Sequence, residues 1–369
     1  MADFDILIIG GGIAGASLAA AIGRRARVAI LEAEDQCGYH STGRSAAFWL
    51  ASYGGPGVMP LTIASHPALE SGWPANERPW LRRRGALYLG DRDVRWDEVA
   101  SIVPAADPAA RWIEGPELAA AVPGLKAPWV KALLEPSCAD IDVAGLHQAC
   151  LAAARRDGAE ILTSTELEQA VFQSGRWTVA TRAGDVRAPV LVNAAGAWAD
   201  RVAQRCGVEP LGLEPRRRTM AQLRVGRSGL ADLPLVIDAG GSFYFKGEAD
   251  SRIWLSPHDE TATDPCDAAP EELDVATAID RFQAVVDWPV EAVERTWAGL
   301  RTFARDRMPV IGFDENAPGY FWCAGQGGFG IQTAPAAAAI AAALLLGESL
   351  PEFVEAIDPR PYAPGRLRI

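Results

Sequence analysis

The chain has 369 residues, of which 49% are hydrophobic and 22% are charged, and its formal net charge is −12 at pH 7. This length allows two domains or one large domain with an insertion, and the composition is typical of a globular protein. Basic clusters such as "PRRR" at 215–218 are short, so the sequence argues against nucleic acid or an anionic membrane as a partner.

The N-terminus predicts a strand, a glycine turn, a helix and a second strand. "FDILIIG" is a continuous apolar run that ends at Gly10, which is typical of a strand covered on both faces. "GGIAGASLAAAIGRRA" follows as a helix, and "RVAILEAE" is a second buried strand ending at Glu32. Asp3 and Asp5 stand where a signal peptide would need positive charge. We therefore expect a βαβ unit here and no secretory signal.

The middle of the chain predicts one long helix and then mostly strands. The helix begins at Asp142 and ends at Gly158. Strands follow, with turns at Ser174–Gly175 and Gly184–Asp185, and they end in the buried strand "VLVNAAG". The segments "RTMAQLRV", "LPLVIDAGGSFYFKG" and "RIWLSPH" alternate enough to predict an antiparallel sheet.

Near the C-terminus, "YFWCAGQGGFGIQTAPAAAAIAAALL" predicts a strand, a glycine turn and an apolar helix too short to span a bilayer. The two strand–glycine–helix units therefore lie at opposite ends of the chain, with antiparallel material between them. This order predicts an α/β nucleotide-binding domain built from separated segments, with an inserted α+β domain that carries an antiparallel sheet. We place the first domain at 1–48, 140–215 and 296–369, and the second at 49–139 and 216–295.

The glycine pattern GxGxxG at Gly10, Gly12 and Gly15 lies between the first predicted strand and helix. The first glycine allows a tight turn, the second lets backbone approach a pyrophosphate, and the third lets the helix pack on the strand. The helix N-terminus then offers partial positive charge to the phosphates. Glu32 is placed to accept hydrogen bonds from a ribose, which disfavours NADP. The pattern predicts a dinucleotide, either FAD or NAD.

A second glycine turn favours FAD over NAD. Gly325, Gly327, Gly328 and Gly330 precede the last predicted helix, and NAD would not need such a turn. A helix N-terminus at 331–333 would stabilise the negative charge that reduced flavin carries around its N1 and C2 carbonyl.

The six cysteines are scattered and show no metal-ligand spacing. We therefore expect reduced thiols, no metal site and a soluble, cytoplasmic protein without a transmembrane segment. The four histidines form no recognisable catalytic arrangement, and we interpret His40 as a structural partner of its loop rather than as a base.

In this order, "IIGGGIAGASLA" with "LEAE", "GYHSTGRSAA", "VLVNAAGAWAD", "WAGLRTFARDRMPVIG" and "GQGGFGIQTAP" resemble the D-amino-acid-oxidase-like flavoproteins. Within that family they look most similar to the bacterial D-arginine and D-amino-acid dehydrogenases. The resemblance covers nearly the whole chain, and it implies a Rossmann-like FAD domain with an inserted substrate domain. The FAD is expected to be non-covalent, because nothing around Cys323 matches the cysteine attachment of sarcosine oxidases.

The resemblance also implies which residues bind the FAD, with the adenine lying near Leu167. The expected residues are Gly10, Gly12, Ile13, Ala14, Gly15, Glu32, Ala33, Ser41, Thr42, Gly43, Arg44, Ser45, Ala46, Ala47, Phe48, Leu167, Ala195, Gly196, Trp198, Arg301, Gly327, Gly328, Phe329, Gly330, Ile331, Gln332 and Thr333.

For a small-molecule substrate, the family binds a carboxylate with arginine, whose two parallel N–H groups match two oxygens. Arg301 in "WAGLR" matches that position, and Arg218 is the expected second arginine, with Arg216 and Arg217 as alternatives. Tyr53 and Tyr244 match the tyrosines that cover the bound amino acid.

The implied reaction is hydride transfer from the substrate α-carbon to flavin N5. The resulting imino acid is hydrolysed to a 2-oxo acid and ammonia. The electron acceptor, whether a quinone, oxygen or another molecule, is unknown. Two other functions stay open: oxidation of secondary amines such as N-methyl or cyclic amino acids, and a non-catalytic flavin-binding subunit or sensor.

The sequence departs from the D-arginine dehydrogenase pattern in the substrate pocket. Phe48 stands where that enzyme has a histidine, and its acidic position falls on Ala86 or Leu87. An apolar pocket cannot hold a guanidinium without a large desolvation cost. We expect D-arginine to be a poor substrate and apolar or neutral side chains to be favoured. The expected pocket residues are Phe48, Leu50, Leu87 and Gly328, with Tyr53 beside them.

Overall fold

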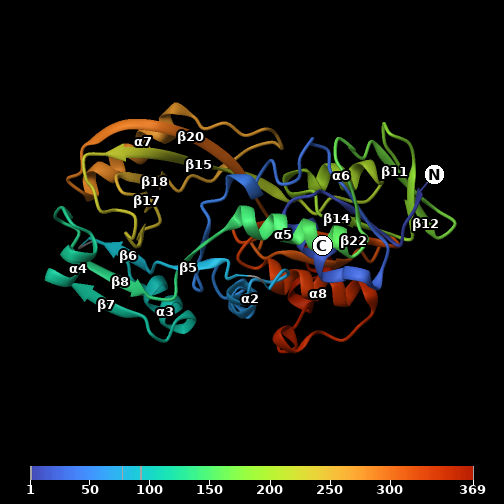
Figure 1. Ribbon diagram of the computed structural model, residues 1–369, viewed down its shortest axis with the longest axis horizontal. Helices are drawn as coiled ribbons and strands as arrows, with labels where there is room; N and C mark the ends of the chain where they lie inside the picture. The colour runs from blue at the N-terminus through green and yellow to red at the C-terminus, as the bar shows by residue number, and fades with distance from the viewer. Residues whose placement is uncertain (1, 77, 92–93, 369) are drawn as a thin grey trace.

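A computed structural model describes residues 2–76, 78–91 and 94–368 (Figure 1). The half of the molecule at the right of Figure 1 is built on a six-stranded sheet in which only the last strand is antiparallel. Its order is β10 (Glu160–Leu162), β3 (Val28–Leu31), β2 (Ile6–Ile9), β14 (Val190–Asn193), β22 (Tyr320–Ala324) and β21 (Val310–Phe313). The strands predicted at the two ends of the chain therefore meet in one sheet.

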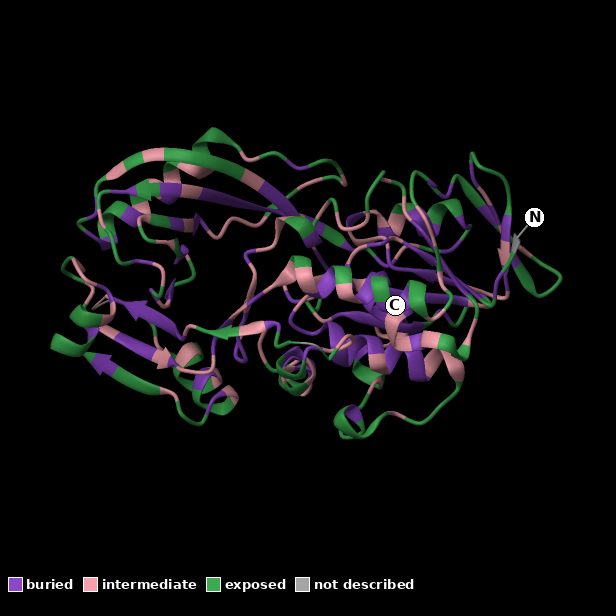
Figure 2. Ribbon diagram, in the orientation of Figure 1, coloured by how far each residue is buried: buried purple, intermediate pink, exposed green. Residues whose placement is uncertain are grey.

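Both faces of this sheet are covered, which explains the continuous apolar run of β2. Ile6 and Ile8 pack on one face in a cluster with helices α1 (Ile13–Ile22), α5 (Val143–Arg156) and α8 (Ala334–Leu346). Leu7 and Ile9 face the other side, in a cluster with a second sheet and α6 (Ala199–Arg205). That second sheet has the order β1 (Ala2–Asp3), β13 (Val186–Ala188), β12 (Arg176–Ala180) and β11 (Gln169–Gln173). Figure 2 shows α8 as largely buried.

A larger, mostly antiparallel sheet forms the other half. It runs through β23 (Gln326–Gly327), β20 (Val290–Phe303), β15 (Glu214–Val225), β18 (Arg252–Ser256), β17 (Tyr244–Ala249), β16 (Leu235–Asp238), β6 (Ala86–Gly90), β8 (Lys131–Glu135) and β7 (Arg111–Glu114), and β19 (Thr261–Ala262) pairs with β15. Helix α7 (Glu272–Val285) packs on one face of this sheet. The domain division stays a prediction, and its boundary at residue 296 falls inside the continuous strand β20.

The remaining elements are shorter. A small sheet consists of β4 (Phe48–Trp49), β9 (Ala139–Ile141) and β5 (Leu81–Arg83). Helix α2 (Met59–Ser71) contacts α8, whereas α3 (Asp97–Ala106) and α4 (Gly115–Ala121) contact β8 of the large sheet. The predicted helix start at Asp142 is confirmed, because its side chain accepts a hydrogen bond from the Gly145 N–H at 2.8 Å. Within the described part of the chain, no helix is both long enough and apolar enough to cross a bilayer.

Candidate active site

A large cavity opens at the carboxyl ends of β2, β3 and β14 and extends to β15 and β20 of the large sheet. The residues predicted from sequence that line it are Gly10, Gly12, Ile13, Ala14, Glu32, Ala33, Ser41, Thr42, Arg44, Ser45, Ala46, Leu167, Ala195, Gly196, Trp198, Arg218, Tyr244, Arg301, Gly327, Gly328, Gly330 and Ile331. They come from segments far apart in the sequence. The cavity lies where the family resemblance places the FAD and the substrate.

The glycine turn after β2 has the close contacts that its motif requires. Gly10 has φ +107°, and a Cβ atom on Gly15 would lie 2.0 Å from the Gly10 carbonyl oxygen. Glu32 accepts hydrogen bonds from the N–H groups of Gly11 at 2.8 Å and Glu34 at 3.0 Å. The carboxylate of Glu32 is therefore held at the cavity wall. The glycine turn leaves room for a pyrophosphate, and the Glu32 carboxylate can accept hydrogen bonds from a ribose.

The loop after Glu32 is fastened to both halves of the molecule. Thr42 Oγ1 accepts a hydrogen bond from the Ile13 N–H at 3.0 Å, and Ser41 Oγ donates to the Leu300 carbonyl at 2.6 Å. The Arg44 guanidinium donates to the Ala298 carbonyl at 3.1 Å and pairs with Asp267. Arg44 therefore links the loop to β20, and its charge is paired with Asp267.

Several predicted cofactor residues do not line this cavity; these are Gly15, Gly43, Ala47, Phe48, Phe329, Gln332 and Thr333. Gln332 is buried, and it accepts from the Leu50 N–H at 3.2 Å and donates to the Tyr53 carbonyl at 3.2 Å. It therefore holds the turn that carries Tyr53. Helix α8 begins at Ala334 with Thr333 as its N-cap, so the helix N-terminus predicted at 331–333 is confirmed, and Ile331 and Gln332 form the turn before it.

Arg301 lines the cavity and contacts Tyr53, which does not line it. Arg301 Nη1 donates a hydrogen bond to the Tyr53 hydroxyl at 2.6 Å. Burial pushes the pKa of Tyr53 upward, but the charges of Arg301 and Arg218 outweigh it and lower that pKa below its ordinary value. Gly328 packs directly on the guanidinium, since a Cβ atom there would lie 2.9 Å from Arg301 Nη1.

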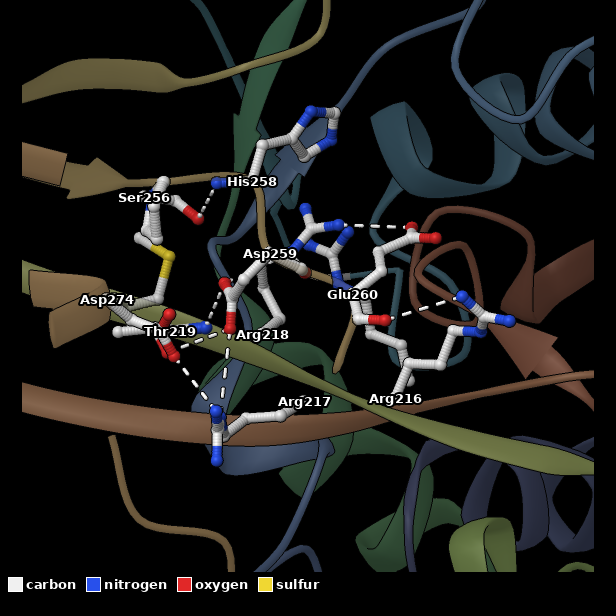
Figure 3. A network of polar contacts seen from close by, with 12 residues as sticks. Arg216, Arg217, Arg218, Thr219, Ser256, His258, Asp259, Glu260 and Asp274 are labelled. Atoms are coloured by element: carbon white, nitrogen blue, oxygen red, sulfur yellow. Dashed lines mark hydrogen bonds and ion pairs between the residues drawn. The ribbon is translucent and has the colours of Figure 1, made fainter. Parts of the chain in front are cut away.

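Of the three consecutive arginines on β15, Arg218 lines the cavity. Arg217 points to the opposite face of the strand and pairs with Asp274 at 2.9 Å, as side-chain alternation requires (Figure 3). Arg216 pairs with Glu214 at 2.5 Å. The side chain of Arg218 is only 3% exposed, and its Nη1 atom is buried without a hydrogen-bond partner. A buried guanidinium nitrogen left unpaired at a cavity wall indicates a site for an anionic ligand group.

Aromatic rings form a wall near the two arginines. Phe48 lies 5.6 Å from the Tyr53 ring and 5.9 Å from the Tyr244 ring, centroid to centroid, and Tyr53 lies 5.0 Å from Phe329. Leu50 belongs to the same apolar cluster as Phe48, Tyr53 and Tyr244.

Leu87 does not join this wall, contrary to expectation. It packs with Phe245 and Phe282 on the α7 side of the large sheet. Its neighbours Ala86 and Tyr88 face the opposite side, in the cluster that contains Phe48. Successive residues of a strand alternate between faces, so Ala86 is the member of the pair nearer to the pocket.

Further residues line the cavity that the sequence reasoning did not single out. They include Glu34, Tyr39, Arg201, Arg205, Thr302 and Gln326. Arg205 donates a hydrogen bond to the Leu167 carbonyl at 2.7 Å. Arg201 and Arg205 could have been predicted from the sequence, because their i, i+4 spacing places them on one face of α6. His40 Nε2 lies 2.9 Å from Glu34 Oε1, and its ring centroid lies 4.4 Å from that of Trp198, so His40 is a partner of the loop.

The cysteines carry no cross-link among the described residues. Cys323 is buried in β22, where burial raises the pKa of its thiol to about 12, and it does not line the cavity. A thiol kept neutral and away from the cavity is unsuited to attach a flavin. Across residues 2–76, 78–91 and 94–368, no group of His, Cys, Asp or Glu is arranged to hold a metal ion.

Comparisons with known proteins agree with this geometry. The DAO model of FAD-dependent oxidoreductases matches residues 5–344. Hydrogen cyanide synthase subunit HcnC of Pseudomonas aeruginosa is 25% identical over 99% of this chain and 96% of its own length. Glycine oxidase of the same organism is 30% identical over 68% of this chain and 67% of its own.

Among solved structures, L-proline dehydrogenase from P. horikoshii has a TM-score of 0.85 and 21% identity, covering 99% of this chain and 98% of its own. This likeness confirms the fold: a Rossmann-like domain together with a substrate domain. The closer similarity to D-arginine dehydrogenase stays a prediction. The chain belongs to the family of FAD-dependent oxidoreductases, and it is an enzyme whose cofactor is FAD.

Proposed function

We propose that this enzyme oxidises α-amino acids at the carbon that bears the amine, and that it prefers D-amino acids with apolar or neutral side chains. The products are a 2-oxo acid and ammonia. The observation that carries this proposal is the buried, unpaired Nη1 of Arg218 at the wall of the same cavity as Arg301. Two guanidinium groups in one partly enclosed site suit a carboxylate.

Bound FAD supplies the hydride acceptor. The residues of this chain would then bind and orient the substrate: Arg218 and Arg301 take its carboxylate, and Tyr53 holds Arg301 in place through the 2.6 Å hydrogen bond. Tyr244 and Phe48 cover the substrate and exclude water. Such placement is the main requirement of hydride transfer, since no strong base is needed when the amine is uncharged.

The side-chain preference is supported by the apolar cluster of Phe48, Leu50 and Ala86. Glu135 is the cross-strand partner of Ala86, but it is fully buried and its carboxylate accepts a hydrogen bond from Ser52 Oγ at 2.5 Å. It does not line the cavity, so Glu135 is not available to pair with a substrate guanidinium. D-Arginine and D-lysine should therefore be poor substrates.

A second candidate is the oxidation of secondary amines. It is supported by the structural similarity to an enzyme named L-proline dehydrogenase. The proposed carboxylate site would also bind a cyclic or N-methyl amino acid, because these substrates carry the same carboxylate. The third possibility, a flavin-binding subunit or sensor without turnover, is distinguished by experiment.

The test is anaerobic bleaching of the oxidised holoenzyme by a panel of D-, L- and N-methyl amino acids. We expect the fastest bleaching with D-leucine, D-methionine or D-phenylalanine. Faster bleaching by proline or N-methyl amino acids would establish the second candidate. A clear preference for D-arginine would contradict the pocket assignment, and no bleaching by any amine would refute catalysis of amine oxidation.

A further inference from the structure

We infer that Glu260 determines charge specificity: its carboxylate offsets the positive charge of the arginine pair, so the site takes amino acids with one carboxylate and discriminates against those with two. This inference rests on the proposed function, in which Arg218 and Arg301 bind the substrate carboxylate. Glu260 itself does not line the cavity, so it acts through Arg218 as a positioning residue.

Glu260 lies directly before β19 and is held between two arginines. Its Oε1 atom accepts from Arg218 Nη2 at 3.2 Å, and the arrangement is visible in Figure 3. On the other side, Arg307 donates to Oε1 at 2.8 Å and to Oε2 at 3.0 Å, and its guanidinium stacks 3.9 Å from the Phe303 ring centroid. The bidentate pair with Arg307 keeps the carboxylate of Glu260 in one place.

The position of Arg218 follows from this segment. Arg218 Nε donates to the Asp259 carbonyl at 2.7 Å, and Nη2 donates to Glu260, so two of its three nitrogens are occupied. Nη1 is buried and has no partner. Glu260 therefore leaves Arg218 with one free nitrogen at the cavity, which suits one carboxylate oxygen.

The side chain of Glu260 is 28% exposed, and its charge acts on the cavity through Arg218, whose side chain is 3% exposed. Burial raises the pKa of Glu260, but Arg307 and Arg218 outweigh that effect and lower the pKa, so the group is ionised at neutral pH. Arg218 is buried, whereas the Arg307 side chain is 48% exposed, so solvent screens the charge of Arg307 more strongly. Asp259 is also buried beside Arg218, with its carboxylate 3.9 Å from Arg218 Nε. A second carboxylate on the ligand, if it lay beside Arg218, would meet these negative charges.

The experiment compares the binding of butyrate and succinate to the oxidised holoenzyme, followed by the change in flavin absorbance. These two acids have the same number of carbons and differ by one carboxylate. The wild-type enzyme should bind butyrate more tightly than succinate. Glu260→Gln keeps the size and the hydrogen-bond acceptor but removes the charge, so the ratio of the two dissociation constants should shift toward succinate by about tenfold.

Two further variants separate charge from position. Glu294→Gln loses the same charge at an exposed pair with Arg252, far along β20, and should leave the ratio unchanged. Glu260→Ala also removes the support of Arg218, so KM for the best amino acid substrate should rise while kcat changes little.

An unchanged butyrate-to-succinate ratio in Glu260→Gln would overturn the inference, as would a shift of equal size in Glu294→Gln. A wild-type holoenzyme that binds neither acid would instead refute the carboxylate site of the proposed function.

Discussion

Replacing Glu135 by glutamine removes a buried carboxyl group beside the turn that carries Tyr53. Glu135 is 0% exposed at the end of β8. Its oxygens accept hydrogen bonds from the Ser52 N–H at 3.2 Å and from Ser52 Oγ at 2.5 Å, and Ser52 Oγ also contacts the Tyr88 hydroxyl at 2.6 Å. Glutamine is nearly the same size, and its amide can keep a hydrogen bond with Ser52. The substitution therefore changes mainly the titration of the site.

The magnitude follows from the pKa of this group. Burial raises the pKa of Glu135 from 4.5 to about 7, against the opposing effect of the Ser52 hydrogen bonds. Because the folded-state pKa is higher than the unfolded one, this group's contribution to stability is fully present below pH 4.5 and is lost as the pH rises to 7. At about 1.4 kcal/mol per pKa unit, the full loss is about 3.4 kcal/mol, of which about 2.5 kcal/mol falls between pH 5 and pH 8.

The assay is urea unfolding of FAD-saturated wild-type enzyme and Glu135→Gln at pH 5 and pH 8. The wild type loses the contribution of Glu135 between pH 5 and pH 8, and the variant has no such contribution to lose. The free energy of unfolding of the variant, minus that of the wild type, should therefore be about 2.5 kcal/mol higher at pH 8 than at pH 5. Glu355→Gln, a change at an exposed glutamate, should follow the wild-type profile. Parallel profiles for Glu135→Gln and the wild type would refute the reasoning, because they would show that Glu135 titrates alike in the folded and unfolded chains.

Three further predictions concern the cavity. Tyr53→Phe removes the acceptor of the Arg301 hydrogen bond, so KM for the best amino acid should rise roughly tenfold to a hundredfold with unchanged FAD content; an unchanged KM would show that other contacts hold Arg301. Gly328→Ala places a methyl carbon 2.9 Å from Arg301 Nη1, so butyrate should bind the holoenzyme more weakly, and equal affinity would contradict this packing. Glu32→Gln replaces the carboxyl group that accepts a hydrogen bond from the Gly11 N–H, so fluorescence titration of the apoprotein should show about tenfold weaker FAD binding; wild-type affinity would remove Glu32 from the FAD site.

The sequence was sufficient for features that depend on neighbouring residues. The buried strand before Gly10, the helix start at Asp142 and the turn at Ser174–Gly175 are all present as predicted. Their signals are short-range: a continuous apolar run, a capping side chain and a residue pair that favours a turn. A dinucleotide cofactor was also predictable, because the glycine motif and Glu32 lie within one βαβ unit, whereas the choice of FAD over NAD needed the second glycine turn near the C-terminus.

Long-range packing settled which side chains share the site. Arg218 rather than Arg216 or Arg217 lines the cavity, and Ala86 rather than Leu87 faces the aromatic wall. Neighbouring residues of a strand point to opposite faces, which separates Arg218 from Arg217 and Ala86 from Leu87, and the face that meets the cavity depends on how the large sheet lies against the rest of the molecule. Arg216 shares the face of Arg218 but pairs with Glu214. The roles of Glu260 and Glu135 could not be inferred from sequence for the same reason. Their partners lie at least 42 residues away along the chain and are adjacent only in the folded protein.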